Sequence, residues 1–130
     1  ELYRQAAQEV PEARQAVRRL EKAGRAQQIV GWLLVAYAML KGARLGFLPK
    51  EYAAKGAKTF DGIVRTKLHF DGESLNLEGI CLVAGLGPEN NRRRNGTFEY
   101  YISEPVVRND AKGVAPFLLC YTEIKRLTPA

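Results

Sequence analysis

The feature that most restricts the fold is an apolar run from Ile29 to Leu40, which carries no charged side chain. A helix that is apolar on every side is either buried in a core or spans a membrane. A membrane span needs about 20 apolar residues, and this run ends at Lys41. The sequence therefore predicts a buried core helix over 27–45, with Gly46 as its C-terminal cap.

The aromatic residues of this helix, Trp32 and Tyr37, are interpreted as core aromatics rather than as platforms for a ligand. Downstream, Pro49 opens a second long helix that runs to about Lys67, because apolar residues recur at helical spacing. The apolar stripe expected on this second helix comprises Tyr52, Ala53, Gly56, Phe60, Ile63 and Val64.

The remaining elements are shorter. Residues 1–10 are predicted to form a short helix, and residues 11–23 a surface helix. The Asp71-Gly72 turn signal predicts a β-hairpin over 68–77. Pro116 suits the first turn of a last helix over 117–127, because a proline there lacks only an N–H that would be unpaired anyway. The residues expected to face inward on that helix are Phe117, Leu118, Tyr121, Ile124 and Leu127.

Composition limits the function classes. The chain has 130 residues, so we expect one helical domain over 1–130. Its net charge of +6 would suit nucleic acid, an anionic membrane surface or a uronic acid sugar. Much of the excess lies on residues 14–25, where a solvated helix face explains it better. We therefore expect no nucleic-acid partner and no membrane partner.

Cysteine and histidine content argues against a metal site. Cys81 and Cys120 each lie in apolar sequence, and we expect them to be buried as small hydrophobic side chains without a disulfide. Together with the single His69 they cannot supply three or four metal ligands, so we expect neither a metal nor a cofactor. His69 itself is interpreted as a surface or packing histidine. The N-terminal sequence shows no signal-peptide pattern, and the compartment stays undecided between cytoplasm, for a bacterial parent, and secretion.

A polar, aromatic stretch between two apolar segments is the candidate site. Aromatic rings cover the apolar faces of sugars, while amides and carboxylates bond to the hydroxyls. The alternative interpretation is structural: Glu104 and Asp110 cap helices, and the tyrosines pack. The candidate substrate-binding residues are Tyr100, Tyr101, Glu104, Asn109 and Lys112.

Two weaker motifs lie in the same stretch. Gly85 and Gly87 form a G-x-G pattern, which lacks the third glycine of a nucleotide-binding loop, so a nucleotide site is rejected. The tripeptide Asn95-Gly96-Thr97 fits a glycosylation sequon, which has meaning only in a secreted protein.

The same stretch resembles the C-terminal signature of the unsaturated rhamnogalacturonyl hydrolases, glycoside hydrolase family 105. The resemblance depends on three runs: ICLVAGLG over 80–87, FEYYISEPVV over 98–107 and NDAKGV over 109–114. The run LVAYAMLKGARLGFLP over 34–49 is also similar to the family. Residues 28–130 thus resemble the C-terminal part of the family's domain, whereas 1–27 do not resemble it.

The resemblance implies a mainly α fold in which helical hairpins form part of an (α/α)6 barrel, with one short β-hairpin. It also implies hydration of the C4=C5 double bond of an unsaturated galacturonyl residue, at the end of a pectin-derived oligosaccharide. In the family an aspartate serves as general acid and base, and it belongs to the N-terminal half of the domain, outside the part that this chain resembles. The catalytic residue therefore stays unknown here.

Two interpretations remain open. The chain is the C-terminal portion of a carbohydrate-active hydrolase, or it is a non-catalytic helical module that self-associates through exposed barrel faces. Whether the chain turns over substrate by itself is also left open. Because an apolar helix in so short a chain leaves part of its surface uncovered, we expect a homo-oligomer.

Overall fold

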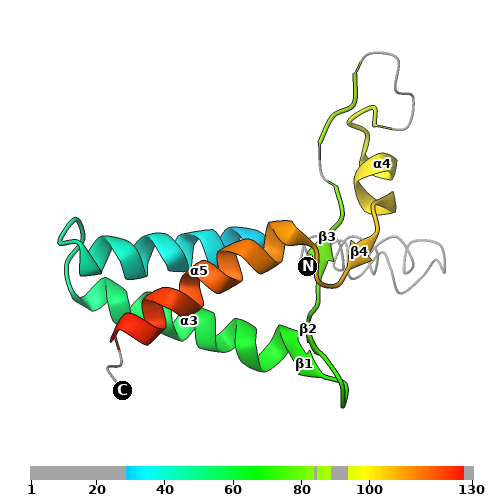
Figure 1. Cartoon of the computed structure of the whole chain (residues 1–130). Coiled ribbons are helices and arrows are strands. Elements are labelled where there is room, and N and C mark those ends of the chain that lie inside the picture. The colour runs from blue at the N-terminus through cyan, green and yellow to red at the C-terminus, as the bar shows by residue number, and fades with distance from the viewer. Residues whose placement is uncertain (1–28, 84, 89–93, 128–130) are drawn as a thin grey trace, which may run out of the picture.

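The computed structural model describes residues 29–83, 85–88 and 94–127. Residues 29–44 are helical and run antiparallel to α3 (Glu51–Lys67), as Figure 1 shows. Between them Gly46 adopts φ +79°, a left-handed conformation that favours glycine, and the N–H of Phe47 donates to the carbonyl of Gly42. The predicted extent of α3 and the cap at Gly46 are confirmed. The helices expected over 1–10 and 11–23 lie outside the described residues.

The two antiparallel helices approach each other most closely at Gly56. A Cβ atom added there would lie 2.9 Å from the carbonyl oxygen of Ala36 and 2.9 Å from Cγ of Leu40. Gly56, Phe60 and Ile63 are the buried residues of α3, so the core of its predicted stripe is confirmed. The absence of a side chain at Gly56 therefore sets the spacing of the helix pair.

The last helix, α5 (Ala111–Leu127), crosses this pair (Figure 1). The rings of Phe60 and Phe117 lie 4.9 Å apart between centroids, which joins α3 to α5. Cys120 is fully buried, and its thiol donates to the carbonyl of Leu33 at 3.1 Å. Burial raises the pKa of this thiol to about 11. Both cysteines are buried free thiols, as expected.

The predicted start of the last helix was wrong. The helix begins at Ala111, because the Asp110 carboxylate accepts a hydrogen bond from the N–H of Lys112 at 2.9 Å and caps the first turn. Pro116 consequently lies inside the helix, where a proline removes one backbone donor. Pro116 is itself buried.

The inward face of α5 also differs from the prediction. Leu118, Tyr121 and Leu127 are exposed, whereas Phe117 and Ile124 are partly buried against the core. The buried residues of α5 are Gly113, Pro116, Cys120 and Glu123. A glutamate can face inward here because two arginines neutralise its charge.

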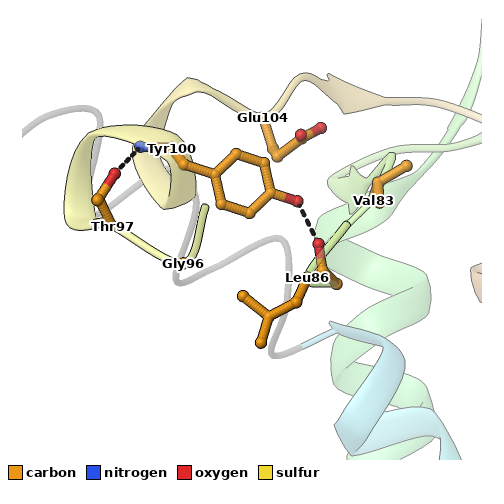
Figure 2. A pocket seen from close by; sticks show the side chains of 7 residues that line it. Val83, Leu86, Gly96, Thr97, Tyr100 and Glu104 are labelled. Atoms are coloured by element: carbon orange, nitrogen blue, oxygen red, sulfur yellow. Dashed lines mark hydrogen bonds between the residues drawn. The ribbon is translucent and has the colours of Figure 1, made fainter. Parts of the chain in front are cut away.

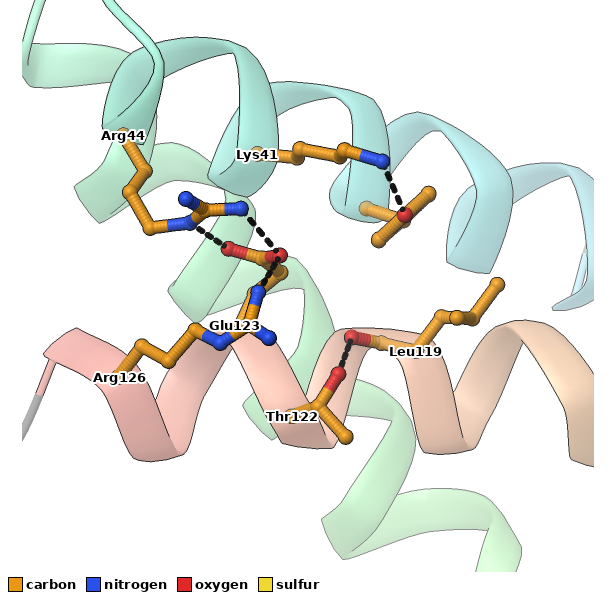
Figure 3. Close-up of polar contacts among 7 residues, drawn as sticks. Lys41, Arg44, Leu119, Thr122, Glu123 and Arg126 are labelled. Atoms are coloured by element: carbon orange, nitrogen blue, oxygen red, sulfur yellow. Dashed lines mark hydrogen bonds and ion pairs between the residues drawn. The ribbon is translucent and has the colours of Figure 1, made fainter.

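These two arginines hold Glu123 from both sides (Figure 3). The guanidinium of Arg44 donates from Nε to Oε2 and from Nη2 to Oε1, and Nη1 of Arg126 donates to Oε1 at 3.0 Å. Hydrogen bonding from Arg44 holds the pKa of the Glu123 carboxyl below its usual range. A lowered carboxyl pKa adds stability above the ordinary glutamate pKa, and that stability is lost as the pH falls through the lowered value.

The prediction that the helix over 27–45 is buried on all sides was wrong for its described part. Ile29, Leu33, Ala36 and Leu40 are buried, whereas Trp32 is 53% exposed. Its neighbours Leu34 and Val35 are exposed as well. Among the described elements, α3 and α5 pack against one side of this helix, which leaves the opposite side uncovered. Tyr37 packs against the core as expected, but Trp32 does not.

Within the described ranges, none of the helices combines the length and the apolar character that crossing a membrane requires.

Two short antiparallel ladders complete the fold. Strand β1 (Leu68–Phe70) pairs with β2 (Leu75–Leu77), and Asp71 accepts hydrogen bonds from the N–H groups of Glu73 and Ser74 in the turn. This confirms the predicted hairpin, and His69 on it is exposed as expected. Strand β3 (Ile80–Cys81) pairs with β4 (Val106–Val107), and a short helix α4 (Phe98–Ser103) lies between them in the chain.

The close approach at Gly56 generates a matched pair of substitutions on one helix. Gly56→Ala should destabilise the fold by about 1–3 kcal/mol, because the new methyl group meets backbone at 2.9 Å. Gly62→Ala should stabilise it by up to about 1 kcal/mol, because Gly62 has open space around it and alanine favours helix. Urea unfolding followed by circular dichroism measures both. Equal midpoints for the two variants would contradict the close contact.

Candidate functional site

The chain leaves the helical body after β3 and returns to it at β4. We call the described residues between these strands the excursion: residues 82–83 and 85–88 are its first limb, and residues 94–105 are its second limb. Figure 1 shows the excursion projecting beyond the helical body, with α4 next to β4. At its base Cys81 lies opposite Val106 in the β3–β4 ladder, and the N–H of Leu82 donates to the carbonyl of Pro105 at 2.9 Å. The polar residues of the candidate site are thus carried on an excursion with a closed base.

A pocket of about 140 Å³ lies between the two limbs of this excursion. The residues that line it are Val83, Gly85, Leu86, Gly96, Thr97, Tyr100 and Glu104. Figure 2 shows the Tyr100 ring extending from α4 toward the opposite limb. Its hydroxyl donates to the carbonyl of Gly85 at 2.8 Å, and Oγ1 of Thr97 accepts from the N–H of Tyr100 at 3.3 Å. Tyr100 therefore links the two limbs.

Two groups in this pocket influence each other electrostatically. Tyr100 and Glu104 are both buried, at 8% and 6% exposure. Burial, and after it the negative charge of Glu104, raises the pKa of the Tyr100 phenol, so its hydroxyl remains a hydrogen-bond donor. A carboxylate beside an aromatic ring and apolar side chains can accept hydrogen bonds from sugar hydroxyls.

Asn109 lies at the other end of the candidate site, and the hairpin engages both ends of its side-chain amide. Oδ1 of Asn109 accepts from the N–H of Leu77 at 2.9 Å, and Nδ2 donates to Oδ1 of Asn76 at 2.7 Å. The backbone of Asn109 has φ +58°, a left-handed conformation that asparagine tolerates better than most residues. In this structure Asn109 joins the hairpin to the start of α5.

Lys112 is half exposed in the first turn of α5. Its Nζ lies 2.7 Å from Oδ1 of Asp110, and this hydrogen bond is the main reason that the pKa of the Asp110 carboxyl is lowered. The pKa of the Cys81 thiol responds to charges from both parts of the site, Glu104 and Lys112. Burial raises its pKa, the charge of Glu104 raises it further and that of Lys112 lowers it. Glu104 comes two residues before β4, which pairs with β3, and Lys112 precedes Gly113, which contacts Ile80 of β3.

The structure brings Tyr100 and Glu104 together at the pocket, and places Asn109 and Lys112 together at the start of α5. The backbone of Tyr101 is in α4, but its side chain lies outside the description. A substrate-binding role for these five residues stays a prediction. Part of the alternative interpretation, in which these residues serve the fold, is confirmed as well: Tyr100 is buried, and Asp110 caps α5.

Sequence reasoning missed the rest of the pocket lining. Thr97 is the N-cap of α4, and a threonine before a helical turn is a recognisable capping signal. Val83 and Leu86 carried no such signal, because their place in the lining depends on how the two limbs meet.

Other parts of the described chain offer less to a polar ligand. A hollow of about 300 Å³ lies between the hairpin and α5, and its lining is apolar apart from Asn109. No group of three or more metal-ligating side chains occurs within the described ranges.

Comparison with known proteins identifies the relatives of this chain. The model of Glycosyl Hydrolase Family 88 matches residues 30–128. "Protein Atu3128" of Agrobacterium fabrum and the "24.9 kDa protein in picA locus" of Rhizobium radiobacter are each 42% identical to it over 95 residues. This alignment covers 69% of this chain and 41% of each relative.

A solved structure agrees with these matches. A family 105 glycoside hydrolase of C. acetobutylicum is 41% identical, with a TM-score of 0.60 over 70% of this chain and 25% of that one. This match confirms the predicted fold class, a mainly helical fragment of an (α/α)6 barrel with one short β-hairpin. The predicted resemblance to family 105 is likewise confirmed.

The chain spans less than half the length of these curated relatives and a quarter of the solved structure. Because the family model covers most of its residues, from 30 to 128, the chain belongs to Glycosyl Hydrolase Family 88, a family of carbohydrate hydrolases.

Proposed function

We propose that this chain is the C-terminal portion of an unsaturated rhamnogalacturonyl hydrolase that acts on pectin-derived oligosaccharides. One observation supports the proposal: Tyr100 and Glu104 line one pocket, and Lys112 lies in the first turn of α5, whose Gly113 contacts Ile80 of β3. All three residues lie within the range that the family model matches.

The chemistry of these groups suits an acidic sugar. A uronate carboxylate needs a cation, and Lys112 supplies one at a half-exposed position beside β3. Sugar hydroxyls need acceptors, and Glu104 supplies a carboxylate at the pocket. The net charge of +6 favours the approach of an anionic oligosaccharide.

The described aspartates of the chain are all held in structural roles. Asp61 is exposed and pairs with Arg65 one turn along α3, at 2.9 Å. Asp71 accepts hydrogen bonds in the hairpin turn, and Asp110 caps α5. Hydrogen bonds lower the pKa of both Asp71 and Asp110, so these groups are ionised at neutral pH and cannot donate a proton readily. The general acid of this proposal is therefore outside these residues.

The isolated 130-residue chain should consequently show no turnover of an unsaturated galacturonyl disaccharide. Loss of a positioned general acid or base removes about 10² to 10⁴ in rate from that effect alone. The assay follows the ultraviolet absorbance of the C4=C5 double bond, with a complete family member as the positive control. Turnover that Asp110→Asn abolishes would overturn this expectation and make the chain an enzyme in its own right.

Binding should nevertheless be measurable and should depend on Lys112. Lys112→Gln should weaken binding of the disaccharide by about tenfold or more, because a charge-assisted hydrogen bond is worth about 1.5–3 kcal/mol. Lys125→Gln, in the last turn of the same helix, removes the same charge and should leave affinity unchanged. Titration calorimetry measures both. Equal losses would mean that only net charge matters, and no binding by any variant would favour the second function below.

A second function, a self-associating helical module, has a separate observation behind it. Trp32, Leu34 and Val35 are exposed apolar side chains on the helix over 29–44, where the sequence predicts burial. Apolar patches of this kind promote association. Under this hypothesis the exposed side of the helix over 29–44 is the interface between copies of the chain.

The association prediction uses Trp32 as its probe, because it is the single tryptophan of the chain. The chain should form a dimer or a larger oligomer, and its tryptophan emission should shift to shorter wavelength as concentration rises. Leu34→Lys should return it to a monomer, whereas Leu75→Lys, at a leucine on the hairpin that is also more than half exposed, should not. A monodisperse wild-type monomer at high micromolar concentration by light scattering would refute the module.

A further inference from the structure

We propose that Asn95-Gly96-Thr97 is a self-modifying site at which the Asn95 side chain cyclises onto the backbone and becomes an aspartyl or isoaspartyl residue. All three residues are exposed. Oδ1 of Asn95 accepts two hydrogen bonds from Thr97, one from its N–H at 3.0 Å and one from its hydroxyl at 2.8 Å. This inference is independent of the proposed function.

The two Thr97 donors lie where a reaction at Asn95 would develop charge. When the backbone nitrogen of Gly96 attacks Cγ of Asn95, the C=O double bond opens and Oδ1 becomes an oxyanion. Donors at 2.7–3.1 Å from such an oxygen stabilise the transition state of acyl transfer. The N–H and hydroxyl of Thr97 are both within that range of Oδ1.

The reaction balances with water as its only other reactant. The Gly96 nitrogen forms a bond to Cγ and gives up its proton to solvent. The bond from Cγ to Nδ2 then breaks, and the side-chain nitrogen leaves as ammonia. Water adds to either carbonyl of the resulting five-membered succinimide, which gives aspartate when one ring bond opens and isoaspartate when the other opens. No electrons are transferred to or from the chain.

Gly96 makes this position suitable for ring closure. It has no Cβ to obstruct the approach of its nitrogen, and its φ of +76° is one that glycine adopts without strain. Two other asparagines are the internal comparison. Asn76 and Asn109 hydrogen-bond to each other through their side-chain amides, and a bulkier residue, Leu77 or Asp110, follows each of them.

The modification would reach the pocket, because Thr97 takes part in two contacts. Its Oγ1 donates to Asn95 and accepts from the N–H of Tyr100. Isoaspartate lengthens the main chain by one methylene group and adds a negative charge beside Thr97. Gly96 and Thr97 line the pocket, so its wall should loosen, and the amide of Tyr100 should exchange with solvent faster.

The test is to age the folded chain in mildly alkaline buffer and to follow Asn95 by peptide mass mapping and isoaspartate assay. Wild type should convert at Asn95 and not at Asn76 or Asn109. Thr97→Val should slow conversion about fivefold, the factor that corresponds to one ordinary hydrogen bond. Thr97→Ser, which keeps both donors, should behave as wild type. In aged wild type the Tyr100 amide should show faster hydrogen exchange than in fresh protein.

The same chains unfolded in urea are the matched control. There wild type and Thr97→Val should convert at equal rates, because the hydrogen bonds to Oδ1 are lost in both. A folded Thr97→Val that converts as fast as folded wild type would overturn the proposal. Retention of the Asn95 amide in folded wild type, while the unfolded chain converts, would overturn it as well.

Discussion

The contact between Ile80 and Gly113 holds the structure together at the base of the candidate site. Ile80 is fully buried, and a Cβ atom added to Gly113 would lie 2.5 Å from its Cδ1. Ile80 also lies opposite Val107 in the ladder of β3 and β4. The start of the excursion, its return and the first turn of α5 therefore meet at one side chain. Moving it would displace the pocket and the last helix together.

Beyond this contact the polar residues of the family signature divide into two kinds. Asn109 and Asp110 are engaged by the fold itself, in bonds to the hairpin and to the first turn of α5. Glu104 is instead buried at the pocket, and Lys112 is half exposed at the start of the helix, where it pairs with Asp110. The family signature thus combines residues that join elements of the fold with residues at the pocket and at the helix start, and the contacts of each residue tell the two kinds apart.

The sequence predicted the elements whose signals are local. The Asp71-Gly72 turn, the stripe around Gly56 and the cap at Gly46 depend on near neighbours, and all were found. The inward face of α5 could not be read in this way, because burial of Glu123 depends on Arg44, 79 positions away in the chain. The candidate site was found as a stretch, but the pairing of Tyr100 with Gly85 depends on how two limbs meet, which no local pattern encodes.

The thiol of Cys120 has a practical consequence for following this fold. Its burial between α5 and the helix over 29–44, together with its raised pKa, keeps it protonated and out of reach of reagents that attack thiolates. It becomes reactive only when those helices separate. Alkylation of Cys120, followed separately from that of Cys81 by peptide mapping, therefore reports the rate at which these helices separate, and it needs no label added to the chain.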